Sequence, residues 1–298
     1  MPATLPPITR TADERVNWVS SIPFFLVHVL CLTVIFTGFT WTAVILFAAM
    51  YFGRAFFVTA AYHRYFSHKS FRLNRFWQTV FAFQAEATAQ KGVLWWAANH
   101  RHHHRYSDTE LDLHSPRKGF WWSHVGWILS DKYKDTDLSA IKDFAKFPEL
   151  RWLDKHEGMP PWIYGLAAFG IGFWTGGWSG AWAGLVIGFF WSTVLLWHTT
   201  FLVNSAAHVI GRRRYETTDT SRNSLIIALL TGGEGWHNNH HHYQASARQG
   251  FFWWEIDMTY YVLKMMSWVG IVRDLKAPPA RVLRPGSGPD LESELVAA

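Results

Sequence analysis

Two long stretches of the chain carry no Asp, Glu, Lys or Arg. They span residues 16–53 and 158–211, which is 38 and 54 residues. A helix that crosses a bilayer needs about 20 apolar residues, so each stretch is long enough for two crossings joined by a tight turn. Segments that contain glycine predict these turns at residues 37–40 and 176–180.

We therefore predict an all-α membrane protein with four transmembrane helices near residues 22–38, 41–61, 161–176 and 181–207. Trp and Tyr are frequent near the ends of the two stretches, which favours membrane spans over the alternative, the buried helices of a large soluble protein. The predicted outer turns contain no Lys or Arg, whereas 15 lie within residues 62–157 and 10 follow residue 211. This bias predicts a multi-pass protein with both termini and the middle segment in the cytoplasm.

Composition supports this interpretation. Charged residues make up 17% of the 298-residue chain, below the roughly 25% of an ordinary soluble domain, and aromatic residues also reach 17% with 19 Trp. We read the net charge of +6 as a membrane-side signal and expect no nucleic-acid partner. The first 15 residues are polar, so we predict no cleavable signal peptide. Residues 1–275 are expected to form one membrane domain, and the Pro- and Gly-rich residues 276–298 a disordered tail.

The 16 histidines are gathered rather than scattered. Nine of them fall in four groups on the predicted cytoplasmic side: His63, His68, His100, His103, His104, His208, His237, His240 and His241. Two groups have the spacing i, i+3, i+4, which places three side chains on one face of a helix. His63 and His68 are five residues apart, about 140° around an α-helix, so they can meet only if the helix ends or bends between them. Imidazole suits Fe, Zn, Cu or Ni, and nine imidazoles suit two ions.

Some choices stay open at this stage. We call residues 63–68, 100–104 and 237–242 the first, second and third histidine boxes. His102 or His242 could replace a neighbour, because the second and third boxes each end in three consecutive histidines. A carboxylate usually orients a metal-binding histidine. The acidic residues near the boxes, and therefore the candidates for this role, are Asp108, Glu110, Asp112 and Glu234.

Other cofactor chemistry is missing from the sequence. Cys31 is the one cysteine and cannot hold an iron–sulfur cluster, and no glycine-rich dinucleotide fingerprint follows a strand. An oxygen-activating metal site needs electrons. We therefore expect a separate donor protein of the ferredoxin, cytochrome or flavin reductase type.

The histidine pattern resembles the integral-membrane fatty acid desaturases, and in particular the acyl-CoA delta-9 (stearoyl-CoA) type. The strings that carry the resemblance, which extends over about residues 20–270, are HRYFSH at 63–68, GFWWSHVGW at 119–127, NSAAH at 204–208 and GEGWHNNHH at 233–241. The family implies four transmembrane helices and a helical cytoplasmic cap that holds a His-rich dimetal site with two Fe²⁺ ions. It implies that the nine histidines are the ligands and that Asn204 reaches one metal through water.

The resemblance also implies a bent tunnel for the acyl chain. Gln90, Trp96 and Thr200 match residues at the bend, and Tyr51, with Ala55 one turn on, matches the far end. Lys132 matches one of two basic residues that meet the CoA phosphates in animal members. The other basic position is Asp131 here, and an Arg and an acid before the second box are replaced by Ala98 and Asn99. These departures leave a phospholipid or a carrier protein as alternative acyl carriers.

The function implied is insertion of a cis double bond, delta-9, into a saturated acyl chain, with acyl-CoA as the first choice of substrate. Dioxygen and two electrons from the external donor complete the reaction. Two alternatives are a His-box hydroxylase of alkanes or lipids and a membrane metal-binding or transport protein. The short chain without a fused electron-transfer domain suggests a bacterial inner membrane.

Overall fold

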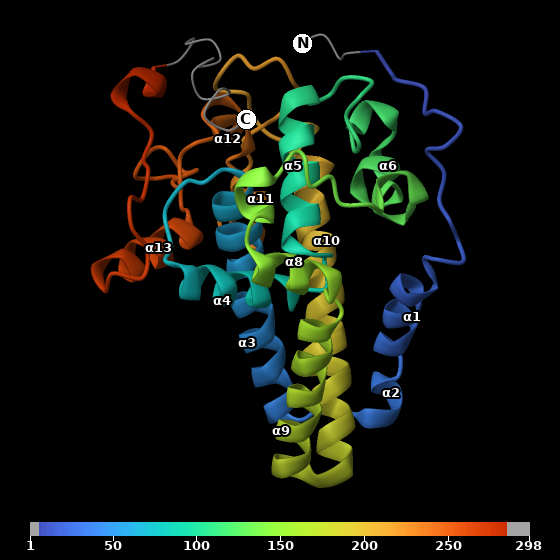
Figure 1. Cartoon of the computed structure of the whole chain (residues 1–298). Helices are drawn as coiled ribbons and strands as arrows, with labels where there is room; N and C mark the ends of the chain where they lie inside the picture. The colour runs from blue at the N-terminus through green and yellow to red at the C-terminus, as the bar shows by residue number, and fades with distance from the viewer. Residues whose placement is uncertain (1–5, 285–298) are drawn as a thin grey trace.

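Residues 6–284 are described by a computed structural model of the chain. They form a narrow helical stem, residues 22–67 and 159–208, beneath a broad cap formed by the residues before, between and after (Figure 1). In this part of the chain, extended backbone pairs only at isolated bridges such as the one between Val16 and Ser130. The predicted all-α class is confirmed.

The stem consists of four helical arms. The first is α1 (Ile22–Cys31) followed by the short α2 (Val34–Thr37), so the predicted span over 22–38 is interrupted at residues 32–33. The second arm is α3 (Trp41–Phe57) with the π-helix η1 (Val58–Ser67). The third arm is the part of α9 (Met159–Ala183) before Gly176, and the fourth is the rest of α9 with the π-helix η5 (Gly184–Trp191) and α10 (Ser192–Asn204). Two continuous runs, Trp41–Ser67 and Met159–His208, are long and apolar enough to cross a membrane, and Ile22–Thr37 is shorter.

The long run is folded into a hairpin at Gly176 and Gly177, where the backbone leaves helical geometry. Gly177 has φ +59°, a conformation that L side chains rarely adopt. The two arms then run side by side, and a Cβ on Gly172 would lie 2.2 Å from the carbonyl oxygen of Gly180. Glycine is therefore required at this crossing, and the turn lies within the predicted 176–180.

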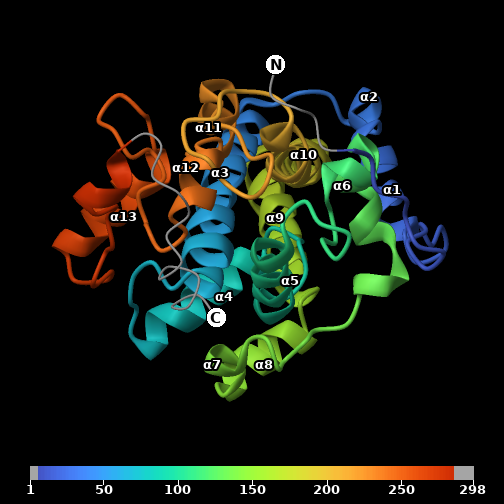
Figure 2. The ribbon, with the colours of Figure 1, turned by 90° about the horizontal axis from the view of Figure 1, so that it is seen from above.

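The cap surrounds α5 (Val93–Tyr106), which stands at its centre with α12 on one side and α6 on the other (Figure 2). The remaining cap helices are α4 (Arg75–Glu86), α6 (Phe120–His124), α7 (Lys142–Ala145), α8 (Pro148–Lys155), α11 (Leu225–Thr231), α12 (His237–His242) and α13 (Met258–Trp268). The largest apolar core joins the upper end of the second arm to α4, α5 and α8. This core holds the histidine-bearing elements against one another.

Part of the predicted disordered tail lies within the described residues. Residues 276–284 pack against the cap: Val282 is buried, its carbonyl oxygen lies 3.2 Å from Nε2 of His242, and Lys276 accepts a hydrogen bond from the backbone of Ala247. Residues 285–298, the rest of the predicted tail, lie outside the described residues.

Candidate metal centre

The structure brings all nine predicted histidines together in two adjoining groups. The first group is His63, His68, His100, His104 and His240, and the second is His103, His208, His237 and His241. Within each group the available ligand atoms lie within 4.8 Å of one another. The rings of His104 and His241 have their centroids 4.5 Å apart and link the two groups. Both groups lie where the upper ends of the stem meet the cap.

A π-helix brings together the two histidines of the first pair, which are five residues apart. His63 lies inside η1, where backbone N–H groups bond to carbonyl groups five residues earlier, and the N–H of His68 bonds to the carbonyl of His63 at 3.2 Å. Residues five apart therefore lie one turn apart on the same face. The centroids of the two rings are 4.8 Å apart, in an edge-to-face arrangement. Sequence reasoning expected a helix end or a bend between the two residues, and η1 is both wider than an α-helix and ends at Ser67, one residue before His68.

The other histidines reach the centre from three elements. Helices α5 and α12 each present an i, i+3, i+4 triplet, as their spacing predicted. Asn204 and His208 do not share one α-helix, because α10 ends at Asn204 and the chain continues as a 3₁₀ turn, Ala206–His208. The tighter turn leaves the His208 ring facing His237, with Nε2 atoms 3.0 Å apart.

Four buried carboxylates hold the outer nitrogen of four of these imidazoles. Nδ1 lies against a carboxylate oxygen in the pairs His63–Glu234, His103–Asp112 (3.0 Å), His208–Asp108 (3.2 Å) and His241–Asp219 (2.6 Å). A carboxylate can only accept, so each Nδ1 carries the proton and each Nε2 presents a lone pair to the centre. This tautomer leaves Nε2 free to bind a metal.

Three of these partners, Asp108, Asp112 and Glu234, were candidates from the sequence. Glu110 was the fourth, and it is exposed. Asp219 was missed, because it lies in a polar loop 22 residues before His241 and nothing in its local sequence distinguishes it. Burial distinguishes it, since Asp219 is only 5% exposed.

A buried arginine links the first histidine box to the segment just before the third box. Arg64, next to His63, is fully buried and lies 3.0 Å from Glu234 and 2.9 Å from Asp257. Glu234 thus contacts both His63 and Arg64. Burial alone would raise the pKa of Glu234, but the neighbouring His63 and Arg64 lower it to about 2, so the residue stays a carboxylate.

Five of the nine imidazoles are held in the neutral form. Burial, followed by the neighbouring imidazoles, lowers the pKa of each of five ring groups well below the usual value: His68, His100, His104, His237 and His240. The pKa of Asp112 is lowered to about 2, since His103 and His114 outweigh its burial. Neutral imidazoles ringed by charged carboxylates are the state in which histidine binds a metal.

The spacing of the inner nitrogens fits bound cations. Nε2 of His63 and of His104 lie 2.9 Å and 3.0 Å from that of His240, and Nε2 of His100 lies 2.9 Å from that of His68. Two ligands about 2.1 Å from one ion, at right angles, lie about 3.0 Å apart. Nε2 of His103 and Nε2 of His241 are buried and have no hydrogen-bond partner within the described residues. Buried lone pairs that converge in this way are costly unless a cation binds them.

The two neighbouring histidines that were possible replacements lie outside both groups. Nε2 of His102 lies 2.9 Å from the carbonyl oxygen of Leu111. His242 stacks on Tyr215 with ring centroids 4.0 Å apart. In both helices the first, fourth and fifth residues, counted from His100 and from His237, carry the grouped imidazoles, as helix geometry predicts.

A cavity of about 790 Å³ leads from the stem to the metal centre. His100 and Asn204 line its inner end, together with the three residues predicted at the tunnel bend, Gln90, Trp96 and Thr200. The amide of Gln90 donates a hydrogen bond to the Thr200 hydroxyl at 3.1 Å, and the Trp96 ring stacks on His100. Tyr51, Ala55 and Lys132 do not line this cavity, and their roles as substrate contacts stay predictions.

Comparison with known proteins agrees with this geometry. A family model described as fatty acid desaturase matches residues 39–266. The chain belongs to the fatty acid desaturase family. It is therefore a membrane fatty acid desaturase, an oxygen-dependent oxidoreductase of lipid metabolism, and its histidine groups are consistent with the dimetal site of that family.

Relatives of this desaturase differ in the acyl carrier and in the bond that they oxidise. An acyl-CoA 5-desaturase from Anemone leveillei is 37% identical, with 90% of this chain and 85% of the relative covered. An sn-1 stearoyl-lipid 9-desaturase from Anabaena variabilis is 34% identical, with 90% and 97% covered. A delta-9 acyl-lipid desaturase from Arabidopsis thaliana is 33% identical, with 89% and 85% covered. The comparisons therefore show the family of the expected delta-9 acyl-CoA type, and both acyl-CoA and acyl-lipid desaturases are among the relatives.

Proposed function

We propose that this desaturase inserts a cis double bond at the delta-9 position of a saturated acyl chain, using dioxygen and two electrons from an external donor protein. The observation that carries the proposal is the position of two adjoining imidazole groups at the inner end of an apolar cavity. Relatives that act at position 9 support the choice of bond.

Two iron ions are the proposed cofactor. The five-histidine group would hold one ion, and the four-histidine group, with Asn204 through a water, would hold the other. Bound iron supplies activation of dioxygen and removal of hydrogen from an unactivated methylene. The donor set supports iron because neutral imidazoles without thiolate suit it, and Asp108, Asp112, Asp219 and Glu234 fix the imidazole tautomers.

The residues of the chain itself position the substrate and exclude water. Gln90 and Thr200, joined by a hydrogen bond, lie beside His100 in the cavity wall and define how an acyl chain passes the centre. Trp96 packs against His100 and Tyr62, which closes the wall behind the bend. Holding one pair of methylene groups against the metal centre lowers the barrier to their oxidation, because the reacting groups are already in position.

We infer that all four arms of the stem cross the membrane and that the cap and both termini lie in the cytoplasm. The turns at Gly38 and Gly177 lie at the end of the stem away from the cap, and neither adjoins a Lys or Arg. Reporter fusions at residue 38 and residue 178 are expected to report the outer side, and fusions in the cap the cytoplasm. A cytoplasmic signal from residue 178 would contradict this topology.

We also propose that the membrane is the plasma membrane of a bacterium. Residues 1–275 are the proposed membrane domain.

For the acyl carrier we propose a membrane lipid in place of the expected acyl-CoA. Lys132, the expected phosphate contact, has its ammonium within 3.1 Å of Asp13 and 3.6 Å of Glu14, so its charge is already paired. The side of the cavity between α1 and α9 is lined by residues that are 51%, 74% and 66% exposed, namely Leu26, Trp162 and Leu166. An acyl chain still attached to a lipid could enter through this side from the bilayer.

Expression in a host without its own desaturase tests the activity, with fatty acids analysed by mass spectrometry. The expected product is a cis monounsaturated acid with its double bond at position 9. A hydroxylated acid as the sole product would favour the hydroxylase alternative. The carrier is tested with purified protein in vesicles, supplied with either labelled stearoyl-CoA or labelled stearoyl phospholipid and an electron donor. Label that becomes unsaturated only on CoA would overturn the lipid proposal.

A further inference from the structure

Helix α13 has more apolar surface than the cap buries. One face, which includes Leu263, packs into the largest apolar core. Four apolar residues of the same helix are exposed by between 38% and 73%, namely Met258, Tyr261, Met265 and Trp268. At 3.6 residues per turn these four fall within an arc of about 80°, and Lys264 and Ser267 lie outside that arc. The helix therefore has three faces: one in the core, one apolar and exposed, and one polar.

The neighbouring helix α11 carries a second exposed apolar surface. Its Ile227 packs against Ala206 and Ala207 at the end of the fourth arm. The N–H of Thr259 in α13 donates to the carbonyl oxygen of Gly232, just after α11, at 2.9 Å, so the two helices adjoin. Four residues of α11 are exposed by between 46% and 72%, namely Leu225, Ile226, Leu229 and Leu230. We call these four residues and the four of α13 the apolar collar.

The collar lies where the stem meets the cap. The Tyr51 hydroxyl of α3 donates to the carbonyl oxygen of Leu230 at 3.0 Å, which places the end of α11 beside the second arm. The hydroxyls of Thr59 in η1 and Thr259 in α13 lie 2.6 Å apart. Figure 1 shows α13 at the lower edge of the cap, beside α4. The collar is therefore continuous with the apolar outer surface of the stem.

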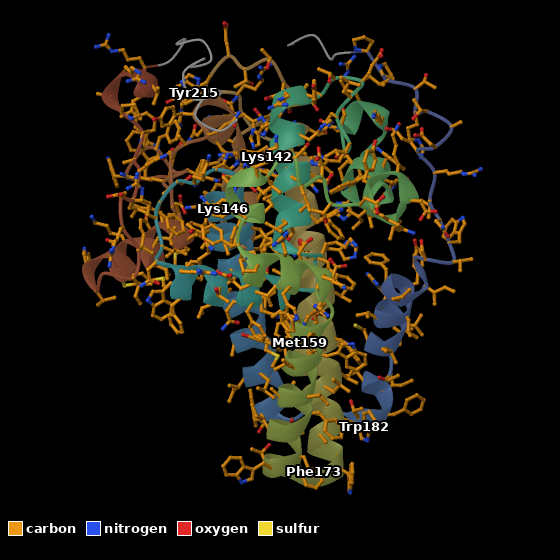
Figure 3. All side chains as sticks on the ribbon, viewed as in Figure 1. Lys142, Lys146, Met159, Phe173, Trp182 and Tyr215 are labelled. Atoms are coloured by element: carbon orange, nitrogen blue, oxygen red, sulfur yellow. The ribbon has the colours of Figure 1, made fainter. Side chains whose placement is uncertain are left out.

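The exposed side chains change in character along the same axis. Trp182, labelled low on the stem in Figure 3, is 51% exposed, whereas the exposed lysines labelled there lie in the cap. The cations Lys264, Arg72 and Arg273 are exposed around α13, and Asp274 pairs with Arg72. An apolar helix face bordered by cations matches a bilayer interface, where acyl chains meet anionic headgroups. A soluble protein partner would have to displace the lipid around the second arm to reach this position.

We propose that α11 and α13 lie in the cytoplasmic leaflet of the bilayer that the stem crosses, with the apolar collar among the acyl chains and Lys264 among anionic headgroups. Residues 232–257, which carry the third histidine box, are then anchored to the membrane at both ends. The bilayer itself holds this part of the metal centre at a fixed height above the acyl chains. The inference rests on the proposed function only in that the stem crosses the membrane.

Single-cysteine variants of the complete protein test this location. Cys31 is the one cysteine in the sequence, so Cys31→Ser provides the background. Each variant is placed, one molecule per disc, in nanodiscs of mixed phosphatidylethanolamine and phosphatidylglycerol and treated with a water-soluble maleimide. We expect Met265→Cys and Ile226→Cys to react at least about tenfold more slowly than Lys264→Cys. Lys264→Cys is the matched control, because its side chain lies one residue away on the polar face.

A nitroxide attached to the acyl chains of the disc lipids supplies the second measurement. It should quench a fluorophore on Met265→Cys more strongly than one on Lys264→Cys. Equal reaction rates of the two variants would overturn the inference. Slow reaction at residue 265 without quenching by the lipid nitroxide would also overturn it, because protein rather than lipid would then cover the collar. Neither measurement requires turnover, so absence of any unsaturated product would be a failure of the proposed function alone.

Discussion

The carboxylate of Asp219 lies 2.6 Å from Nδ1 of His241, and both side chains are buried. This contact places the His241 proton on Nδ1 and leaves Nε2 free to bind a metal. Asp219→Asn can donate through its amide and so allows the wrong tautomer. We expect metal affinity to fall by about 10–100-fold, measured as iron retained against a graded chelator.

Glu216→Gln is the control for this substitution, because Glu216 lies on the same loop with an exposed side chain. It should retain iron as the parent protein does. Equal iron retention in Asp219→Asn and the parent would show that the carboxylate does not orient the ligand.

His104→Ala is expected to abolish desaturation and to loosen the bound metal. Nε2 of His104 lies 2.9 Å from that of His100 and 3.0 Å from that of His240, at the centre of the five-histidine group. His102→Ala is the neighbouring control, since that ring contacts a backbone carbonyl outside the groups. Product analysis and iron content of the two variants check the prediction, and full turnover of His104→Ala with two metals bound would contradict it.

Arg64→Met should destabilise the cap by about 3–5 kcal/mol, because Glu234 and Asp257 would be left as buried charges without their partner. Thermal unfolding in detergent measures the loss. Arg72→Met removes an exposed ion pair with Asp274 and should change the unfolding temperature little. Equal unfolding temperatures for the two variants would mean that the buried pair does not hold the first box to the third.

Acid should release the metal and weaken the fold together. In the folded protein His100 and His104 have lowered pKa values, whereas the same residues in the unfolded chain take up protons below about 6.5. Stability and metal affinity are therefore complete above that pH and fall as the pH drops through it. Glu234 acts in the same direction at lower pH, since it stays charged to about 2 when folded and becomes protonated near 4.3 when unfolded. Iron content and unfolding temperature between about pH 8 and pH 4 measure both effects, and values that do not vary with pH would contradict the prediction.

Several features were determined by the sequence alone. Charge-free stretches predicted the stem, since an apolar environment excludes unpaired charge, and the hairpin at Gly176 and Gly177 falls in the predicted turn. The triplets of α5 and α12 were predictable because helical periodicity alone places i, i+3 and i+4 on one face. These features depend only on residues that are close together in the chain, so they can be predicted from a single sequence.

Only the tertiary structure decided which segments meet. Asp219 reaches His241 across a loop, and η1 is a π-helix whose His63 and C-terminal neighbour His68 both pack against His100 of α5. The course of the cavity is decided in the same way, since Arg54 and Tyr51 bond across to α10 and leave the open space beside α1. Contacts between distant segments depend on how whole helices pack, and no local spacing in the chain contains that information.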